Sequence, residues 1–391
     1  MSPRAPGAVV VGGDYQGLAI MRSLGRQGVD VVVLDDEHSA GRYSRYATGS
    51  VKVSDLRDER VTVDVLLELA RRHRLDGWVV FPTREETVAA LSRHRDELVE
   101  RYRIPTPAWE VIKWAWDKRN TYKLASELGI PAPRSWTLSS LDELDAIDGQ
   151  PPFVIKPAIK ERFLYATGRK AWRAESPGEL RQRVREAGAL IGAGEVIVQE
   201  LIPGGGEAQL AYCAFFKGGR AHARMTVRRL RQHPPDFGRA STFVETVERP
   251  ELDEPSERFL RAIDYYGLVE LEYKHDARDG QPKLLDFNAR TWGYHGLGMR
   301  AGVDFPYHLY ADQTGLPAPD AGRAAAGVSW IRVATDVPTA AVEVARGSLS
   351  LREYVRSLRG CRAESVLSRD DPLPALAELA LLPYLAVRRG F

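Results

Sequence analysis

The sequence predicts a mixed fold, in which an α/β domain precedes a larger α+β region. Over the first hundred residues, short apolar runs alternate with stretches of helical period, which is typical of a doubly wound parallel sheet. Later, residues 269–274 and 283–290 alternate polar and apolar side chains around Asp279-Gly280, which indicates an antiparallel hairpin. The 391 residues, 44% of them hydrophobic, are enough for two or three domains with real cores.

The composition argues against several classes of protein. The formal net charge of +2 gives no reason to expect a nucleic-acid partner. Cys213 and Cys361 are far apart and lack metal-type spacing, which argues against a disulfide framework or a zinc site. A short lead from Met1 runs directly into an apolar strand, so we expect no signal peptide and predict a cytoplasmic location.

The N-terminal third has the order strand, glycine turn, helix, strand. The dinucleotide fingerprint Gly-x-Gly-x-x-Gly is absent, so Asp35 is weak support for NAD, and Gly12 and Gly13 fit a tight turn better than a ligand site. Strands are expected over residues 8–11, 29–34 and 77–82, and helices over residues 18–27, 63–74 and 86–100. Residues 83–86 follow a strand at its carboxyl end, where open α/β sheets bind ligands.

The middle of the chain is rich in lysine and arginine. A helix is predicted from Lys118 to residue 128, stopped by Gly129 and Pro131. Lys156 ends an apolar strand directly before a proline, which is a poor place for a purely solvated lysine. Residues 158–173 contain one glycine, Gly168, inside a cationic stretch. Its cations are Lys160, Arg162, Arg169, Lys170 and Arg173.

Three further segments follow. Residues 195–204 form a predicted strand that ends in a Pro-Gly turn, with Glu207 just beyond it. Residues 208–217 and 220–229 are predicted strands joined by a Gly-Gly turn. Residues 228–238 are dense in guanidinium groups. Arg228 could hold a carboxylate or an acyl phosphate through its planar fork, although a solvated basic loop is an equal alternative.

The hairpin carries the most specific pattern. In an extended strand Asp286, Asn288 and Arg290 share one face, and on the preceding strand Glu270 and Glu272 do the same. Oxygen ligands from two adjacent strands would then lie side by side, as Mg²⁺ prefers. Which of the two glutamates is the ligand stays open at this point, and we favour Glu272.

The sequence Asp286-Phe-Asn-x-Arg290 closely resembles the metal-binding strand of the ATP-grasp superfamily, and the other motifs occur in the family's order. The resemblance implies an ATP-grasp fold with an N-terminal Rossmann-like preATP-grasp domain (residues 1–107), the ATP-grasp domain (108–319) and a small C-terminal extension (320–391). Within the superfamily, the sequence resembles the carboxylate–amine ligase-like proteins, with D-aspartate ligases as more distant relatives.

The resemblance also assigns roles. It implies that ATP is held by Lys118, Lys156, Lys170, Gln199, Glu200, Leu201, Ile202 and Glu207, the last of these at the ribose. It implies metal ligation by Glu272, Asp286 and Asn288, and catalytic roles for Arg290, Lys156 and Arg228. Family members have a mobile glycine-rich flap over residues 158–173. With only Gly168 there, backbone N–H groups or Lys160, Arg169 and Lys170 could cover the phosphates. For His295 a packing role is favoured.

The implied activity is an ATP-dependent ligase that activates a carboxylate as an acyl phosphate for attack by an amine. Its cofactors would be ATP with one or two Mg²⁺ ions, or Mn²⁺, and its partners would be small-molecule carboxylates and amines. A homodimer is possible, and neither nucleic acid nor an integral membrane association is expected. An ATP-grasp small-molecule kinase and a non-catalytic nucleotide-binding regulator are the alternatives.

The C-terminal extension adds a strand over residues 328–333, a short helix over 349–358 and a mostly apolar stretch over 373–387. The apolar stretch is too short to span a bilayer and contains Pro383. We expect a helix docked on the body of the protein, with a weak membrane-surface contact as the alternative.

Overall fold

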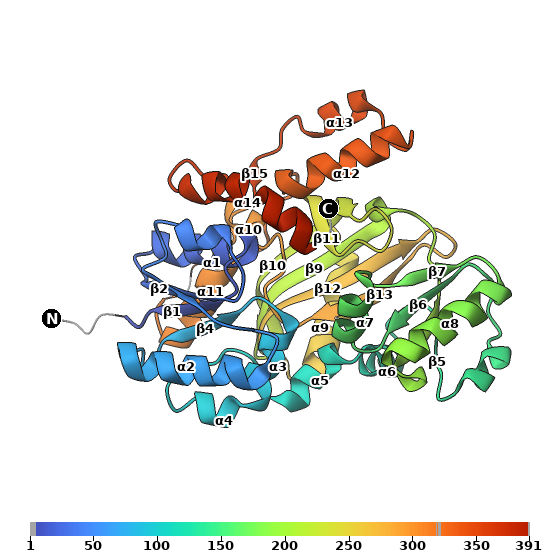
Figure 1. Cartoon of the computed structure of the whole chain (residues 1–391), viewed down its shortest axis with the longest axis horizontal. Helices are drawn as coiled ribbons and strands as arrows, with labels where there is room; N and C mark the ends of the chain where they lie inside the picture. The colour runs from blue at the N-terminus through green and yellow to red at the C-terminus, as the bar shows by residue number, and fades with distance from the viewer. Residues whose placement is uncertain (1–4, 318, 320–321, 390–391) are drawn as a thin grey trace.

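The computed structural model describes residues 5–317, 319 and 322–389, and contains three sheets (Figure 1). The N-terminal sheet is parallel, with strand order β3-β2-β1-β4. Its strands are β1 (Ala8–Val11), β2 (Val31–Asp35), β3 (Gly49–Lys52) and β4 (Val79–Pro82). Its helices are α1 (Tyr15–Arg26), η1 (Ala40–Tyr43), α2 (Glu59–His73), α3 (Glu85–Arg93) and α4 (Arg95–Leu98). The predicted helix over residues 86–100 is therefore divided in two at His94.

The second sheet is small and antiparallel, with strand order β5-β8-β6-β7. Its strands are β5 (Ser135–Thr137), β6 (Phe153–Pro157), β7 (Trp172–Ala174) and β8 (Val196–Glu200). The helices of this region are α5 (Trp109–Trp116), α6 (Lys118–Glu127), η2 (Leu141–Ala146), α7 (Lys160–Thr167), α8 (Pro177–Ile191) and η3 (Ala193–Glu195). Apolar residues of α8 pack on the sheet and form a separate core with it.

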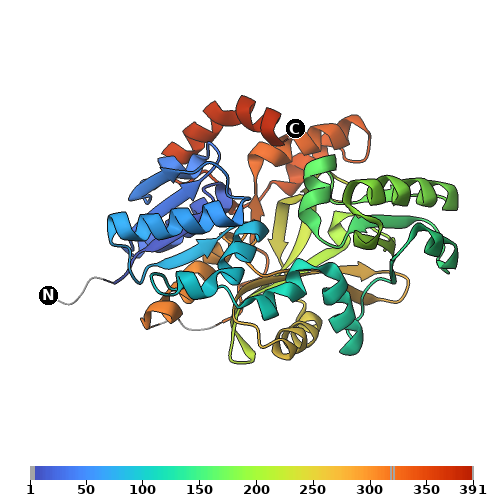
Figure 2. The ribbon, with the colours of Figure 1, turned by 60° about the horizontal axis from the view of Figure 1, so that its bottom comes forward.

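The third sheet has seven strands in the order β13-β12-β9-β10-β11-β14-β15. Its strands are β9 (Gln209–Lys217), β10 (Arg220–His233), β11 (Ala240–Thr246), β12 (Gly267–Asp276), β13 (Gln281–Asn288), β14 (Ser329–Ile331) and β15 (Ala363–Glu364). Shorter helices connect them: η4 (Gly206–Ala208), η5 (Pro250–Leu252), α9 (Asp253–Ala262), α10 (Leu297–Arg300) and α11 (Phe305–Thr314). In both ribbon views this large sheet lies between the N-terminal sheet and the small sheet (Figure 2).

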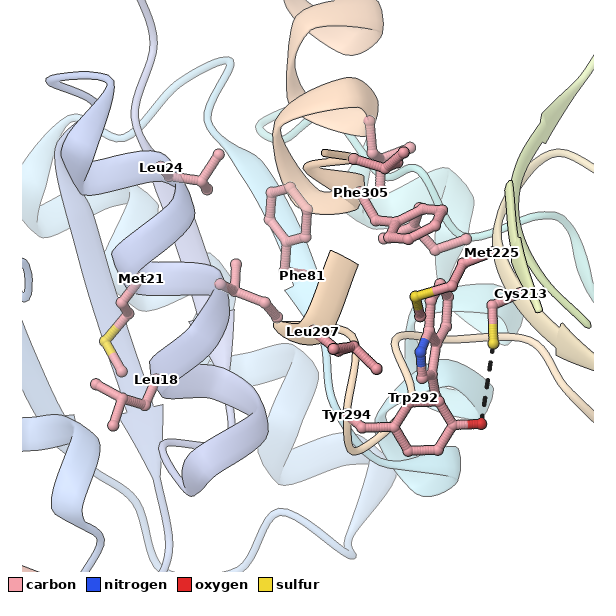
Figure 3. Packing of buried hydrophobic residues seen from close by; sticks show 14 of the residues in the cluster. Leu18, Met21, Leu24, Phe81, Cys213, Met225, Trp292, Tyr294, Leu297 and Phe305 are labelled. Atoms are coloured by element: carbon pink, nitrogen blue, oxygen red, sulfur yellow. Dashed lines mark hydrogen bonds between the residues drawn. The ribbon is translucent and has the colours of Figure 1, made fainter. Parts of the chain in front are cut away.

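Side chains from distant segments join the N-terminal sheet to the large sheet. Leu18 and Phe81 belong to the same buried cluster as Met225 of β10 and Trp292 of the segment after β13 (Figure 3). Trp292 is fully buried, and its ring meets that of Phe305 edge-on at 4.9 Å. Burial of such large rings removes much apolar surface from water. The two sheets therefore share one core, which fixes the position of the first against the second.

The C-terminal segment is built into this body. It places β14 and β15 in the large sheet and adds α12 (Val333–Ala345), α13 (Leu351–Ser357) and α14 (Leu373–Arg389). The buried pair Arg22–Asp371 (2.9 Å) joins α1 to the start of α14. Helix α14 lies against η1, as expected for a helix docked on the body of the protein, and no described helix is long and apolar enough to cross a membrane. The domain boundaries after residues 107 and 319 and the membrane-surface contact stay predictions.

Candidate functional site

A cleft lies between the small sheet and the large sheet. Strands β6 and β8 form one wall, while β9, β10, β12 and β13 form the other. Polar and charged side chains lining it are Lys118, Lys156, Lys160, Lys170, Gln199, Glu200, Gln209, Arg229, Glu272, Lys274 and Asp286. Val154, Leu201, Ile202 and Phe237 add apolar surface. Apolar walls with convergent charges are the usual form of a site for a charged small molecule.

The predicted phosphate lysines meet in this cleft. Lys156 is buried, donates to Oε1 of Gln199 at 2.8 Å and also donates to the Tyr122 hydroxyl. Lys118 donates to Asp286. Burial lowers the pKa of Lys118, but the Asp286 carboxylate outweighs burial, so that the pKa lies above its usual value. Burial lowers the pKa of Lys170. Three ammonium groups therefore face one cavity.

The predicted adenine segment borders the same cleft. Gln199, Glu200, Leu201 and Ile202 all line it, and the Glu200 carboxylate pairs with Arg278 at 2.9 Å. The Glu200 N–H donates to the Arg134 carbonyl (3.0 Å). Glu207 is exposed just beyond the turn, where its Oε1 accepts from the Gly205 N–H at 2.9 Å. Glu207 is therefore outside the cleft lining.

The register of the hairpin places its oxygen ligands side by side. Glu272 lies opposite Asp286, and Glu270 lies opposite Asn288. The Asn288 amide nitrogen donates to both glutamates, at 3.0 Å to Glu270 and 3.1 Å to Glu272. This arrangement leaves the Asn288 amide oxygen as the group that could bind a cation, since the nitrogen is already a donor.

The two glutamates have different surroundings. Glu272 lines the cleft, and although burial raises its pKa, the Arg229 guanidinium at 3.2 Å and nearby Lys170 bring the pKa below its usual value. Glu270 is 4% exposed and accepts from the Tyr294 hydroxyl. Burial, reinforced by the Glu272 charge, raises the pKa of Glu270 to about 7. Glu272 is thus the ionised carboxylate at the surface of the cleft.

Arg290 lies beyond the end of β13, outside the cleft lining. Its Nη2 donates to Oε1 of Glu85 at 2.7 Å, and its Nη1 donates to the Thr291 carbonyl at 2.7 Å. Lys160 Nζ lies 3.1 Å from the same Glu85 oxygen, and Lys160 does line the cleft. Glu85, the first residue of α3, therefore bridges Arg290 to a lysine of the cleft.

Arg228 requires a correction. It lies opposite Leu210 in the ladder with β9, and Leu210 belongs to the core on the other face of the large sheet. Its Nη2 pairs with Glu245 at 3.0 Å. Arg229, the next residue, points into the cleft and meets Glu272. Successive side chains of a strand point to opposite faces, so only one of two adjacent arginines can face the site.

The segment over residues 158–173 also differs from the predicted flap. Residues Lys160–Thr167 form helix α7, and Gly168 ends it with φ of 69°. The single glycine therefore serves as a helix stop, for which a left-handed residue is common. Arg162 and Arg169 do not line the cleft, whereas Lys160 and Lys170 do.

Several residues of the site carry little signal in the amino-acid sequence. Arg229 lay in the guanidinium-dense segment but was not singled out, Lys274 looked like an ordinary strand residue, and Tyr122 looked like a helix residue. Glu85 was marked only by its position after a parallel strand. His295 has the packing role that we favoured: it is fully buried, its Nε2 lies 2.9 Å from the Gln16 carbonyl, and burial lowers its pKa to about 4.

Comparison with known proteins adds three findings. Residues 213–335 match the family model described as "ATP-grasp in the biosynthetic pathway with Ter operon". The D-aspartate ligase of Enterococcus faecium (strain Aus0004) is 24% identical over 275 residues, which cover 65% of this chain and 63% of that protein. The chain thus spans less than two thirds of that relative's length.

Solved structures of similar fold include an L-amino acid ligase from Bacillus licheniformis, with a TM-score of 0.61 and 16% identity over 81% of this chain and 76% of that one. The N5-carboxyaminoimidazole synthetase from Staphylococcus aureus, solved with ADP, has a TM-score of 0.63 and 17% identity, covering 84% of this chain and 82% of that one. At these identities the likeness concerns the fold, and it confirms the predicted fold class.

Proposed function

The chain belongs to the ATP-grasp superfamily, and on that premise we propose that it is an ATP-dependent ligase. It would transfer the γ-phosphoryl group of ATP to a substrate carboxylate, giving an acyl phosphate and ADP. An amine nitrogen would then bond to the acyl carbon while the carbon–oxygen bond to phosphate breaks. Phosphate leaves with the electron pair, and the amine loses a proton. The observation that supports this proposal best is the meeting of three lysines with a carboxylate pair in one cleft.

The lysines suit the phosphates. Lys118, Lys156 and Lys170 come from α6, from β6 and from the segment that precedes β7, and each contributes a compact charge. In the cleft they balance the charge of a triphosphate where little water competes, which strengthens each interaction. Leu201 and Ile202 would flank the adenine. Since the Glu200 N–H is already bonded, backbone groups after it would meet the edge of the base.

The oxygen donors fit a hard divalent cation. Glu272 and Asp286 are opposite one another at the surface of the cleft, and the Asn288 amide oxygen is beside them. Bound there, Mg²⁺ would neutralise charge on the β- and γ-phosphates. Lys118 pairs with Asp286 and Arg229 pairs with Glu272, so these cations hold the carboxylates in place.

Helix α7 would help to keep water from the acyl phosphate. Lys160 at its start lines the cleft, and its contact with Glu85 ties it to the N-terminal sheet. Tyr165 donates to Glu86, and Arg57 stacks on the Tyr165 ring at 4.2 Å. A helix that closes over the cleft through such contacts would shield the acyl phosphate from hydrolysis by water.

The test is product analysis with purified protein, MgATP and paired panels of carboxylates and amines. A ligase releases ADP and free phosphate in equal amounts, and only when both substrates are present. A kinase releases ADP while the phosphate stays on the acceptor, and a regulator releases neither. ADP without free phosphate, or no ADP above the level of an Asp286→Asn control with any pair, would exclude the ligase.

A further inference from the structure

The C-terminal helices expose many apolar side chains. Of the sixteen large hydrophobic residues that are exposed in the described part of the chain, eleven lie in this segment. They are Val333, Val337, Val342, Leu351, Val355, Leu367, Leu373, Leu376, Leu379, Leu382 and Val387. In Figure 1, α12, α13 and α14 form the upper edge of the molecule, and in Figure 2 the C-terminal segment again lies along the top. Exposed apolar side chains gathered in this way mark an interaction surface.

Helix α14 is packed on the body by one side only. The one charged residue between positions 373 and 387, Glu378, pairs with a buried arginine of the body at 2.9 Å. Leu373, Leu376 and Leu379 follow one another at intervals of three, which keeps them on one side of the helix. They are 56%, 61% and 63% exposed. The outer side of α14 is therefore apolar and carries no charge.

Helix α13 adds positive charge beside apolar side chains. Leu351 and Val355 are one turn apart and are 65% and 49% exposed. Arg352 and Arg356 each follow one of them by one position, so the arginines form a second row next to the apolar row. Another side of the helix faces the body, where the Ser357 hydroxyl accepts from an arginine of β10 at 2.8 Å. Both rows therefore point away from the large sheet.

The charges of the C-terminal segment are sorted between the inside and the outside. Six arginines are exposed and form no ion pair within the part of the chain that the structure describes. They are Arg346, Arg352, Arg356, Arg359, Arg362 and Arg369. The aspartates of the segment instead pair with arginines of the body. These pairs are Asp336–Arg231 at 2.8 Å, Asp370–Arg26 at 2.9 Å and Asp371–Arg22 at 2.9 Å. The outward charge of the segment is therefore predominantly positive.

We propose that this surface, formed by α12, α13, α14 and the loops between them, docks on an anionic lipid membrane. A segment that lies at a membrane surface buries apolar side chains at the boundary between headgroups and acyl chains, while its arginines contact anionic headgroups. Helix α14 would supply mainly the apolar contact, and α13 with the turn after it would supply mainly the charge.

A second copy of this chain fits the surface less well than a membrane does. A two-fold interface places the same patch of both copies face to face, so the unpaired arginines would meet one another. Anionic headgroups, in contrast, complement those arginines and the leucines beside them at once. The surface lies outside the nucleotide cleft, so the proposal does not depend on the ligase function.

The experiment measures binding of the full-length protein to lipid vesicles by sedimentation, without ATP. One set of vesicles contains phosphatidylcholine alone, and the other contains equal amounts of phosphatidylcholine and phosphatidylglycerol. We expect the affinity for the anionic vesicles to be higher by about 10-fold or more. It should fall as salt is added, because salt screens exposed charges.

Two variants test the two contributions. Arg352→Gln/Arg356→Gln/Arg359→Gln removes three charges from α13 and the turn after it, and Leu376→Gln/Leu379→Gln makes the outer side of α14 polar. All five side chains are exposed, so circular dichroism should show unchanged folding. Each variant should bind the anionic vesicles about 10-fold more weakly than the unaltered protein does.

Matched controls change exposed residues on other parts of the surface. Arg71→Gln/Arg185→Gln/Arg220→Gln removes three arginines that also form no ion pair among the described residues. Leu190→Gln/Leu316→Gln replaces two exposed leucines. Both control variants should bind the anionic vesicles as the unaltered protein does.

Several outcomes would overturn the proposal. Equal affinity for the two kinds of vesicle, or equal losses in the surface variants and the controls, would contradict it. Sedimentation velocity without lipid tests the second copy. A dimer that Leu376→Gln/Leu379→Gln dissociates, together with no vesicle binding, would assign the surface to self-association. Binding to polyglutamate but not to vesicles would assign the arginines to an acidic protein instead.

Discussion

The β12–β13 hairpin and helix α7 both bring charges to the nucleotide cleft, but they are held very differently. Glu272 and Asp286 lie on two strands whose other faces are packed in a core with Leu271, Leu284 and Phe287. Helix α7 buries only Phe163 among its eight residues. Its contacts with the N-terminal sheet are mainly polar, through Lys160 and Tyr165.

The difference suggests that the hairpin and α7 have separate functions. Charges that must keep their geometry are on strands of the large sheet whose other face is packed, where a displacement would disturb the core. Charges that cover the substrate are on a short helix held by a few polar contacts, which open at a lower cost in free energy. If this is correct, changes in the hairpin should reduce catalysis, and changes in the contacts of α7 should alter how tightly the helix closes over the cleft.

The largest effect is expected at the hairpin carboxylates. Asp286→Asn and Glu272→Gln keep shape but remove charge from the proposed metal site, which should cost several kcal/mol of transition-state stabilisation. Turnover should then fall roughly 10²-fold or more. Steady-state rates and circular dichroism on the same samples check this. Full activity of Glu272→Gln together with loss of activity in Glu270→Gln would show that the more deeply buried Glu270, and not Glu272, is the metal ligand.

Arg290→Lys should bind ATP nearly normally and lose turnover by roughly 10²-fold, as for loss of one oxyanion donor. Lysine cannot reproduce the two-pronged contact that Arg290 makes with Glu85 and the Thr291 carbonyl. The competing view makes this contact purely structural. A lowered melting temperature with a normal rate per folded molecule would support that view and remove Arg290 from the catalytic set.

Lys156→Met should weaken the affinity for a non-hydrolysable ATP analogue by roughly 1.5–3 kcal/mol, because a charge-assisted hydrogen bond to phosphate is lost. Methionine fills a similar volume beside Tyr122 and Gln199. Calorimetry measures the affinity. The exposed Lys123 of α6, next to Tyr122 in the chain, provides the control, and Lys123→Met should bind the analogue as the unaltered protein does.

Glu85→Gln tests the closure of α7. It removes the charge that joins Lys160 to Arg290, so α7 should open more often. Amide hydrogen exchange over Lys160–Thr167 should become several-fold faster, while exchange in β12 and β13 stays unchanged. Glu97→Gln, an exposed surface change, serves as the control. Equal protection of α7 in Glu85→Gln and the unaltered protein would show that this contact does not hold the helix.

The smallest effect concerns pH and the deep glutamate. The folded-state pKa of Glu270, about 7, lies above the ordinary value of 4.5, so protonated Glu270 is favoured by folding. Its contribution to stability is present below pH 4.5 and is lost as the pH rises through 7. Urea unfolding without nucleotide or divalent ions measures the free energy of unfolding of Glu270→Gln and of the unaltered protein. The difference between the two should shift in favour of the variant by on the order of 1 kcal/mol between pH 4.5 and pH 7.5. A constant difference across this range would contradict the assignment.

Local patterns in the sequence were enough for much of the fold and for the centre of the site. The alternation over β12 and β13 placed Asp286 and Glu272 on one face because the strand period of two is a local property. Lys156 was marked by its place at the end of an apolar strand, whereas Gln199, Leu201 and Ile202 were assigned through the resemblance to the ATP-grasp family. All four line the cleft.

What the sequence alone determined is therefore the set of strands and helices and the polar face of the hairpin, since these depend on residues a few positions apart. Only the tertiary structure decided that Arg229 rather than Arg228 faces the cleft, because the register of β10 depends on its partners. Only the tertiary structure brought Glu85 to Arg290, 205 residues away, and Arg332 to Tyr15. Such contacts arise when separate cores pack together, and no local period encodes that packing.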